Sequence, residues 1–207
     1  MRRFLPLFLL LATCCATGLT GLKTSGAAYV PQAGFPGHFT ANAPDAWAQN
    51  HVIYVYMESA LSADTDKAIV SALAEWNYVL NGYVTYEIKD AHWRYDSDFE
   101  DHITATHQGL IFKKVAIDED GTLAEVNEIN GNVVSVYEER SQFWSMRTIM
   151  LHEIGHTLGL RHLPIAGTIM YPYIQLQSPC VDQIAVRELA SEKIYLKLEH
   201  LNYCREE

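Results

Sequence analysis

Basic residues, cysteines and long apolar runs are all scarce in this 207-residue chain. With 15 Lys and Arg against 25 Asp and Glu, its formal net charge is −10, so it offers no basic surface to displace the counterions of a nucleic-acid backbone. No apolar run reaches the roughly 20 residues of a bilayer-spanning helix. We therefore exclude a polynucleotide-binding protein and an integral membrane protein. A hydrophobic share of 49% with a charged share of 19% also excludes a disordered chain, which leaves one acidic globular domain.

The N-terminus has the composition of an export signal. A basic Met1–Arg3 precedes the apolar Phe4–Ala12, and a run of small residues follows. This order predicts a signal peptide over residues 1–16 and an exported protein, which is secreted, periplasmic or lipid-anchored at the envelope. The residues up to Cys14 resemble a bacterial lipobox, whose cysteine would carry a membrane anchor, but Thr13 departs from the usual Gly or Ala. Cleavage after Ala16 without a lipid is the alternative.

Removal of this leader would leave only Cys180 and Cys204. An even pair in an oxidising compartment predicts a disulfide, and two unrelated buried thiols are the alternative. Residues 17–50 are rich in Gly, Ala, Pro and Thr without a sustained period, which indicates a linker or N-terminal arm. Residues 51–207 are then the folded domain, with a monomer favoured.

The first half of this domain is predicted to begin as strand, helix and strand. His51–Tyr56 is β-branched and aromatic, as buried strands are. Apolar residues then recur every three or four positions up to Leu80, which predicts a helix capped by Ser62 or Asp64 and ended by the Asn-Gly pair that follows. Val84–Ile88 alternates as a second strand, and two strands joined by a helix are usually parallel neighbours.

Shorter strands are predicted over Ile103–Phe112 and Lys114–Ile117. A hairpin turn at Asn130-Gly131 leads into another strand at Val133–Tyr137. Because this part combines hairpins with the earlier parallel unit, we expect a mixed sheet. Val181–Leu198 has the apolar spacing of a final helix.

The most informative segment is Leu151–His162, which contains H-E-x-x-H-x-x-G-x-x-H. Five fixed positions coincide by chance on the order of 10⁻⁷ per starting point. On a helix, His152 and His156 lie about 40° apart around the axis and about 6 Å apart along it, so both imidazoles can bind one ion. We expect that helix over Phe143–Leu160, with Ser141 as a candidate cap.

His162 can complete the set of ligands only if the helix ends before it. In a continuous helix it would lie about 9 Å beyond His156, too far to share a zinc ion whose nitrogen ligands lie at about 2.1 Å. Gly159 can adopt a positive φ and turn the chain back. Three imidazoles leave zinc a fourth position for water, as in catalytic sites, and Glu153 can accept a proton from that water and pass it to a leaving amine.

The motif resembles that of the metzincin clan of zinc endopeptidases, and Met170 within Ile-Met-Tyr-Pro resembles the clan's Met-turn below the metal. The residues of this Ile-Met-Tyr-Pro segment and its short distance from His162 are most similar to those of the matrixin branch. This resemblance implies an α+β, zincin-like fold with a twisted, mixed and mostly parallel sheet, an active-site helix and a C-terminal helix. It also implies one catalytic Zn²⁺ and a cleft for protein or peptide substrates, with Tyr173–Ser178 as one wall of a specificity pocket.

Other metals remain open in the sequence. Asp118–Gly121 has some oxygen ligands of a calcium loop but lacks the full alternating set, so a polar hairpin turn is the better interpretation and Ca²⁺ is uncertain. His92, His102 and His107 lie in the region where animal matrixins bind structural metals, but their spacing does not match. We expect them to be surface or strand histidines.

Two further alternatives concern the active site. Tyr171 and Tyr173 follow the Met-turn, and each can stabilise the site, pack, or line the specificity pocket. A non-catalytic, zinc-stabilised, peptide-binding envelope protein is the alternative to the endopeptidase, and the intact Glu153 favours the enzyme. No cysteine-switch latency segment is recognisable in the sequence.

Overall fold

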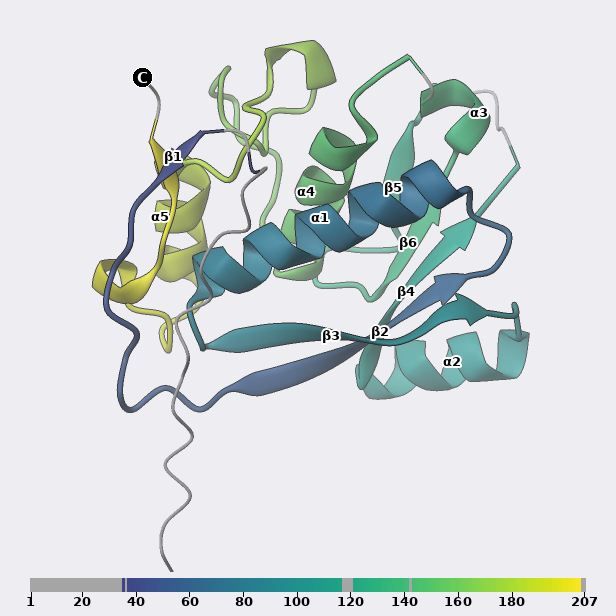
Figure 1. Cartoon of the computed structure of the whole chain (residues 1–207), viewed down its shortest axis with the longest axis horizontal. Helices are drawn as coiled ribbons and strands as arrows, with labels where there is room; N and C mark the ends of the chain where they lie inside the picture. Colours follow the sequence, from purple (N-terminus) through teal and green to yellow (C-terminus); the bar gives the residue numbers. More distant parts are fainter. Residues whose placement is uncertain (1–34, 36, 117–120, 142, 206–207) are drawn as a thin grey trace, which may run out of the picture.

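The main sheet has five strands in the order β3-β2-β4-β6-β5, and all neighbours are parallel except β5 and β6. The computed structural model describes residues 35, 37–116, 121–141 and 143–205 (Figure 1). Helices and this mostly parallel sheet together confirm the predicted α+β class with a mixed sheet. The strands are β2 His51–Glu58, β3 Val84–Trp93, β4 Gly109–Lys114, β5 Ala124–Val126 and β6 Val133–Val136.

The first strand–helix–strand unit forms as predicted. Helix α1 spans Ala63–Leu80, and the Ser62 hydroxyl caps it by accepting a hydrogen bond from the Thr65 N–H at 3.3 Å. Asn81 ends the helix in the left-handed conformation, with φ 43°. Strands β2 and β3 then pair in parallel, which confirms the predicted crossover unit.

The sheet separates two layers of helices (Figure 1). Helix α1 and helix α4, Met146–Thr157, pack together on one face, where the Trp76 indole N–H donates to the Leu151 carbonyl oxygen at 3.0 Å. Helix α2, Ser97–Thr106, covers part of the other face, where Phe99 meets Tyr56 edge to face at 4.9 Å. The larger core therefore lies beneath α4.

The strand predicted over Ile103–Phe112 is wrong at its beginning. Asp96 accepts hydrogen bonds from the N–H groups of Asp98 and Phe99 at 3.0 and 3.1 Å and so starts α2, which ends at Thr106. Strand β4 begins only at Gly109 and ends at Lys114, so the second predicted strand, Lys114–Ile117, does not start at Lys114. Residue 117, the end of that second predicted strand, lies outside the described residues, and β5 was not predicted.

The helix predicted over Val181–Leu198 is shorter in the structure. Helix α5 spans Gln183–Glu192, with Asp182 accepting the N–H groups of its first turn, and it ends because Lys193 is extended. The remaining short elements are α3 Glu138–Ser141 and two 3₁₀ turns, η1 Ile174–Leu176 and η2 Leu198–His200.

The end of the N-terminal arm packs on the domain. Strand β1, His38–Phe39, pairs antiparallel with β7, Cys204–Arg205. The buried Thr40 extends this contact, since its N–H donates to the Tyr203 carbonyl oxygen at 2.9 Å. Within the described part of the chain, no helix combines the length and apolar character that crossing a bilayer requires.

Candidate metal centre and active site

Helix α4 carries His152, Glu153 and His156 with their side chains mostly covered. Ser145 caps this helix by accepting the Thr148 N–H at 3.3 Å. The helix is therefore shorter than the predicted Phe143–Leu160, and Ser141 is not its cap. The predicted range was too long because the residues before Ser145 are apolar enough to continue the helical pattern, although they form turns.

The chain reverses directly after α4. Gly159 has φ +100°, a conformation that glycine adopts without strain, and the Leu160 N–H returns to the Gly155 carbonyl oxygen at 3.0 Å. The Asn130 N–H of the β5–β6 turn donates to the His156 carbonyl oxygen at 3.0 Å and so caps the end of the helix. This reversal brings His162 back to face the helical histidines, as the sequence predicted.

The three imidazoles converge on one point. The Nε2 atom of His152 lies 3.0 Å from that of His156 and 3.1 Å from that of His162. Their other ring nitrogens point away: Nδ1 of His152 lies 2.8 Å from the Ile169 carbonyl oxygen, and Nδ1 of His156 lies 2.7 Å from that of Leu160. A carbonyl oxygen only accepts, so it holds a proton on Nδ1, and the Nε2 atoms of His152 and His156 therefore present lone pairs.

The protonation of this cluster fits a divalent cation. Burial lowers the pKa of His152 to about 3, with the charge of His156 as a second cause. Burial also lowers the pKa values of His156 and His162. Three neutral nitrogen donors facing one another are the donor set that Zn²⁺ prefers, and they form the one metal-binding group among the described residues.

Glu153 directly follows His152 in the sequence. In the structure, it lines the same cavity as His152 and His162. Only 6% of the residue is exposed. Burial, with the nearby charge of Glu125 as a second cause, raises the pKa of Glu153 to about 8, although a hydrogen bond from the Val126 backbone opposes this shift. A neighbouring cation would lower this pKa and favour the carboxylate.

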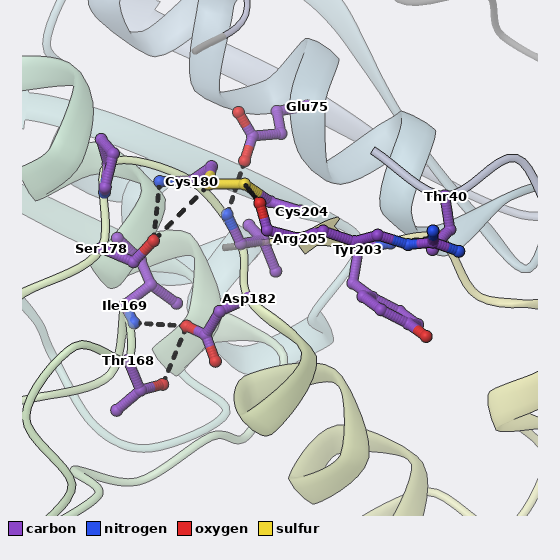
Figure 2. Close-up of a disulfide and its surroundings, with 12 residues drawn as sticks. Thr40, Glu75, Thr168, Ile169, Ser178, Cys180, Asp182, Tyr203, Cys204 and Arg205 are labelled. Atoms are coloured by element: carbon purple, nitrogen blue, oxygen red, sulfur yellow. Dashed lines mark hydrogen bonds between the residues drawn. A yellow bond between two sulfur atoms is a disulfide. The ribbon is translucent and has the colours of Figure 1, made fainter. Parts of the chain in front are cut away.

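Met170 lies completely buried below α4. A Cβ atom added to Gly155 would lie 2.5 Å from the Met170 sulfur, so the glycine lets this turn approach the helix closely. Asp182 fixes the turn from the other side, since one of its oxygens accepts the Thr168 hydroxyl at 2.9 Å and the Ile169 N–H at 2.6 Å (Figure 2). The sequence did not indicate this role of Asp182.

A cavity of about 390 Å³ opens in front of the histidines. Tyr173 lines it, whereas Tyr171 does not and instead lies beside Tyr173 with ring centroids 5.7 Å apart. Its lining comes from three parts of the chain: the segment that leads into β5, helix α4 with the residues on either side of it, and the segment after the Met-turn. The lining residues are Gly121, Thr122, Leu123, Ala124, Trp144, Ile149, His152, Glu153, His162, Pro172, Tyr173, Ile174, Gln175 and Gln177.

Gln177 was not identified from the sequence. Its amide nitrogen lies 2.8 Å from Nδ1 of His152 and donates to the Tyr171 carbonyl oxygen at 2.5 Å. The side chain therefore packs against the edge of the histidine ring and connects the wall to the Met-turn. A lone glutamine in a loop carries no sequence signal of such a contact.

The wall continues into a disulfide between Cys180 and Cys204, whose Cα atoms are 6.0 Å apart (Figure 2). Next to it, the buried Glu75 accepts the Val181 N–H at 2.7 Å and forms an ion pair with Arg147. These bonds join the end of the wall to α1, α4 and the last strand. The sequence predicted the pairing of the cysteines but not the Glu75–Arg147 ion pair.

The remaining candidate residues do not join the metal cluster. His92, His102 and His107 lie on β3, on α2 and directly after α2, and they are not part of the histidine group. Asp118, Glu119 and Asp120 of the calcium candidate lie outside the described residues, as do Cys14 and the rest of the leader.

The sequence model of the matrixin family matches residues 24–188, which is most of the chain. The chain belongs to the matrixin family. This membership confirms the resemblance drawn from the zinc motif. No curated protein sequence matches it significantly.

Two solved structures are similar to this matrixin in part. Metalloproteinase-II from Bacteroides fragilis shares 16% identity at a TM-score of 0.43, over 73% of this chain and 51% of its own. High choriolytic enzyme 1, a hatching-enzyme zinc protease from the medaka fish Oryzias latipes, shares 19% identity at a TM-score of 0.31, over 54% and 44%. This matrixin therefore spans about half the length of these structures.

Proposed function

We propose that this chain is an exported zinc endopeptidase that hydrolyses internal peptide bonds of protein or peptide substrates. The observation that carries the proposal is the convergence of three neutral imidazole nitrogens beside a buried glutamate on one cavity. His152, His156 and His162 would hold the ion. Zinc held by these residues would supply Lewis-acid chemistry: it would make a water acidic enough to react near neutral pH and would polarise a carbonyl group.

Glu153 is the proposed proton carrier. Its carboxylate takes one proton from the attacking water as the water oxygen bonds to the scissile carbonyl carbon. The same carboxyl group then gives that proton to the amide nitrogen as the carbon–nitrogen bond breaks, so the products are a carboxylic acid and an amine. Because the side chain is 6% exposed, it is shielded from competing bulk water.

Two other parts of the chain position the substrate in this proposal. Strand β5 is one of the two edge strands of the sheet, and Ala124 at its beginning lines the cavity, so an extended peptide can lie along it. The predicted wall, Tyr173–Ser178, lines the cavity through four of its residues and would contact the side chain that follows the scissile bond. Tyr173, which is 63% exposed, would contact substrate there.

We further propose export, with residues 1–16 as the signal peptide, residues 17–50 as an arm and residues 51–207 as the peptidase domain. The Cys180–Cys204 disulfide supports an oxidising compartment. Intact mass of the exported protein tests this: a chain beginning at Met1 contradicts export, and a diacylglycerol on Cys14 identifies a lipid anchor. Retention of calcium by the purified protein after dialysis would decide the calcium question.

The catalytic proposal is tested by comparing Glu153→Gln with His156→Ala. Glu153→Gln keeps the three imidazoles and nearly the same volume, so zinc content should stay at the wild-type level while cleavage of a peptide library falls by about 10²- to 10⁴-fold. His156→Ala removes a ligand and should lower zinc content itself. If wild-type protein loaded with zinc cleaves no library peptide, the chain is a zinc-stabilised binding protein instead. If Glu153→Gln cleaves at the wild-type rate, Glu153 is not the proton carrier and the proposed mechanism is wrong.

A further inference from the structure

A second pocket of about 270 Å³ lies away from the metal centre, where the N-terminal arm meets the start of β2 and the segment after α5. None of its residues lines the catalytic cavity. We call it the aromatic pocket, and its lining is Asp45, Trp47, Ala48, Gln49, His51, Tyr83, Tyr195 and Lys197. Its size is near the lower end of the roughly 300–1,000 Å³ of small-molecule sites, which suits a ligand of one or two rings.

Aromatic rings form the open side of this pocket. Trp47 is 88% exposed and Tyr195 is 49% exposed, although burial of such rings is strongly favourable. The Tyr195 ring meets the His51 ring edge to face at 6.1 Å, so its orientation is held. The backbone under the indole is also held, because the Trp47 N–H donates to the Asp45 carboxylate at 2.9 Å. A hydrogen-bonded turn therefore exposes the Trp47 ring to solvent.

The polar part of the pocket is an ion pair with free hydrogen-bonding capacity. One Asp45 oxygen accepts both the Lys197 ammonium at 2.7 Å and the Tyr83 hydroxyl at 3.0 Å. The Lys197 hydrogen bond lowers the pKa of Asp45 to about 2, so the pair is ionised and carries no net charge near neutral pH. Asp45 takes one of the three ammonium donors of Lys197, whose side chain is 50% exposed. Gln49 adds an exposed amide that both donates and accepts.

We propose that the aromatic pocket binds a neutral carbohydrate of one or two pyranose rings. A pyranose has a face of C–H groups that packs on the electron-rich face of Trp47 or Tyr195, and its hydroxyls donate and accept at the rim. The Asp45–Lys197 pair carries no net charge of its own, and the nearby charge of Glu199 disfavours an anionic ligand. A proline-rich peptide could use the rings and offer carbonyl acceptors to Lys197, but its proline residues have no N–H donors for the acceptor of the Gln49 amide.

Binding here would hold the protein on glycan-bearing material without involving the metal site. The inference is independent of the proposed peptidase activity, because no residue of the aromatic pocket belongs to the metal centre or its cavity. The occupant would be recognised by ring faces and hydroxyl groups rather than by a peptide sequence.

The test is isothermal titration calorimetry of the full chain with cellobiose, lactose and N,N′-diacetylchitobiose. We expect at least one disaccharide to bind with a Kd of about 1 mM. Trp47→Ala should weaken that binding at least about tenfold, and Trp47→Phe should restore part of it. Tyr95→Ala is the matched control, since Tyr95 is also an exposed aromatic residue, at 54%, but lies outside the pocket, and it should bind as wild type.

Three results would overturn the proposal. The first is that none of the three disaccharides binds. The second is that Trp47→Ala binds as well as wild type while its melting temperature shows an intact fold. The third is that a proline-rich peptide binds more tightly than every disaccharide and loses its affinity in Trp47→Ala, which would make the aromatic pocket a peptide site.

Discussion

Replacing Glu75 by Ala should destabilise the protein more than any single exposed ion-pair change, because this carboxylate joins three segments around the active site. Glu75 on α1 is 0% exposed, is paired with Arg147 of α4, and accepts the Val181 N–H at 2.7 Å. Arg147 also donates to the Pro179 carbonyl oxygen at 2.7 Å and to the Ser71 hydroxyl at 3.0 Å. The pair thus holds the end of the specificity wall.

The magnitude follows from burial. Removal of one partner leaves the Arg147 guanidinium, whose side chain is 18% exposed, without its carboxylate, and breaking a buried pair in this way costs about 3–5 kcal/mol. That is a large part of the roughly 5–15 kcal/mol that stabilises a domain. At about 2–4 °C per kcal/mol for a chain of this size, the melting temperature should fall by about 6–20 °C. Glu75→Gln keeps an acceptor for Val181 and should cost less, about 1–3 kcal/mol.

The assay is urea and thermal unfolding at saturating zinc with the disulfide intact. The matched control is Asp64→Ala on the same helix, which removes an exposed pair with Lys67 and should cost less than about 1 kcal/mol. A double-mutant cycle of Glu75→Ala with Arg147→Met should show a coupling of at least about 1 kcal/mol. Equal costs for Glu75→Ala and Asp64→Ala, or additive effects in the cycle, would refute the reasoning.

Three other predictions follow from single contacts. Gly155→Ala should destabilise by about 1–3 kcal/mol, although helix propensity alone predicts stabilisation, because the new Cβ would lie 2.5 Å from the Met170 sulfur; a higher urea midpoint would contradict this. Replacing both Cys180 and Cys204 by Ser, which opens a loop with a sequence separation of 24, should cost about 3 kcal/mol in urea unfolding, and a cost below about 1 kcal/mol would argue against the disulfide. The pKa of Asp45 is lowered to about 2, so its carboxylate stabilises the fold above the unfolded pKa of about 3.9 and loses that contribution as the pH falls toward 2. The difference in melting temperature between wild type and Asp45→Asn, measured with chelator, should therefore shrink over that pH range. A constant difference would contradict the shift.

Local patterns predicted the elements that carry the chemistry. The spacing of His152 and His156 depends only on the pitch of a helix, and Gly159 supplies the one conformation that lets the chain turn directly after it. The capping of α1 likewise depends on residues three positions apart, and of the two predicted candidates, Ser62 and Asp64, the structure has Ser62. Such features are visible in sequence because their physical causes lie within a few residues.

Propensity failed where packing or a distant partner decided the outcome. Ile103 is β-branched and was assigned to a strand, but Asp96 starts a helix, and Ile103 is the one residue of α2 that the structure buries. The preference of a β-branched residue for a strand over a helix is worth less free energy than the helix cap at Asp96 and the burial of Ile103 contribute. The same limit applies to α4, whose first turn begins at Ser145 rather than at the apolar residues before it.

The sequence by itself determined the candidate metal ligands, the glutamate beside them and the turn that brings His162 back, because each rests on short-range geometry. Only the tertiary structure decided which distant residues support and surround them. Glu75 meets Val181 across 106 positions, and Asp45 meets Lys197 across 152. Contacts at such separations form only when the whole core orders the chain, and the interaction of two polar side chains leaves no periodic pattern along the sequence from which it could be predicted.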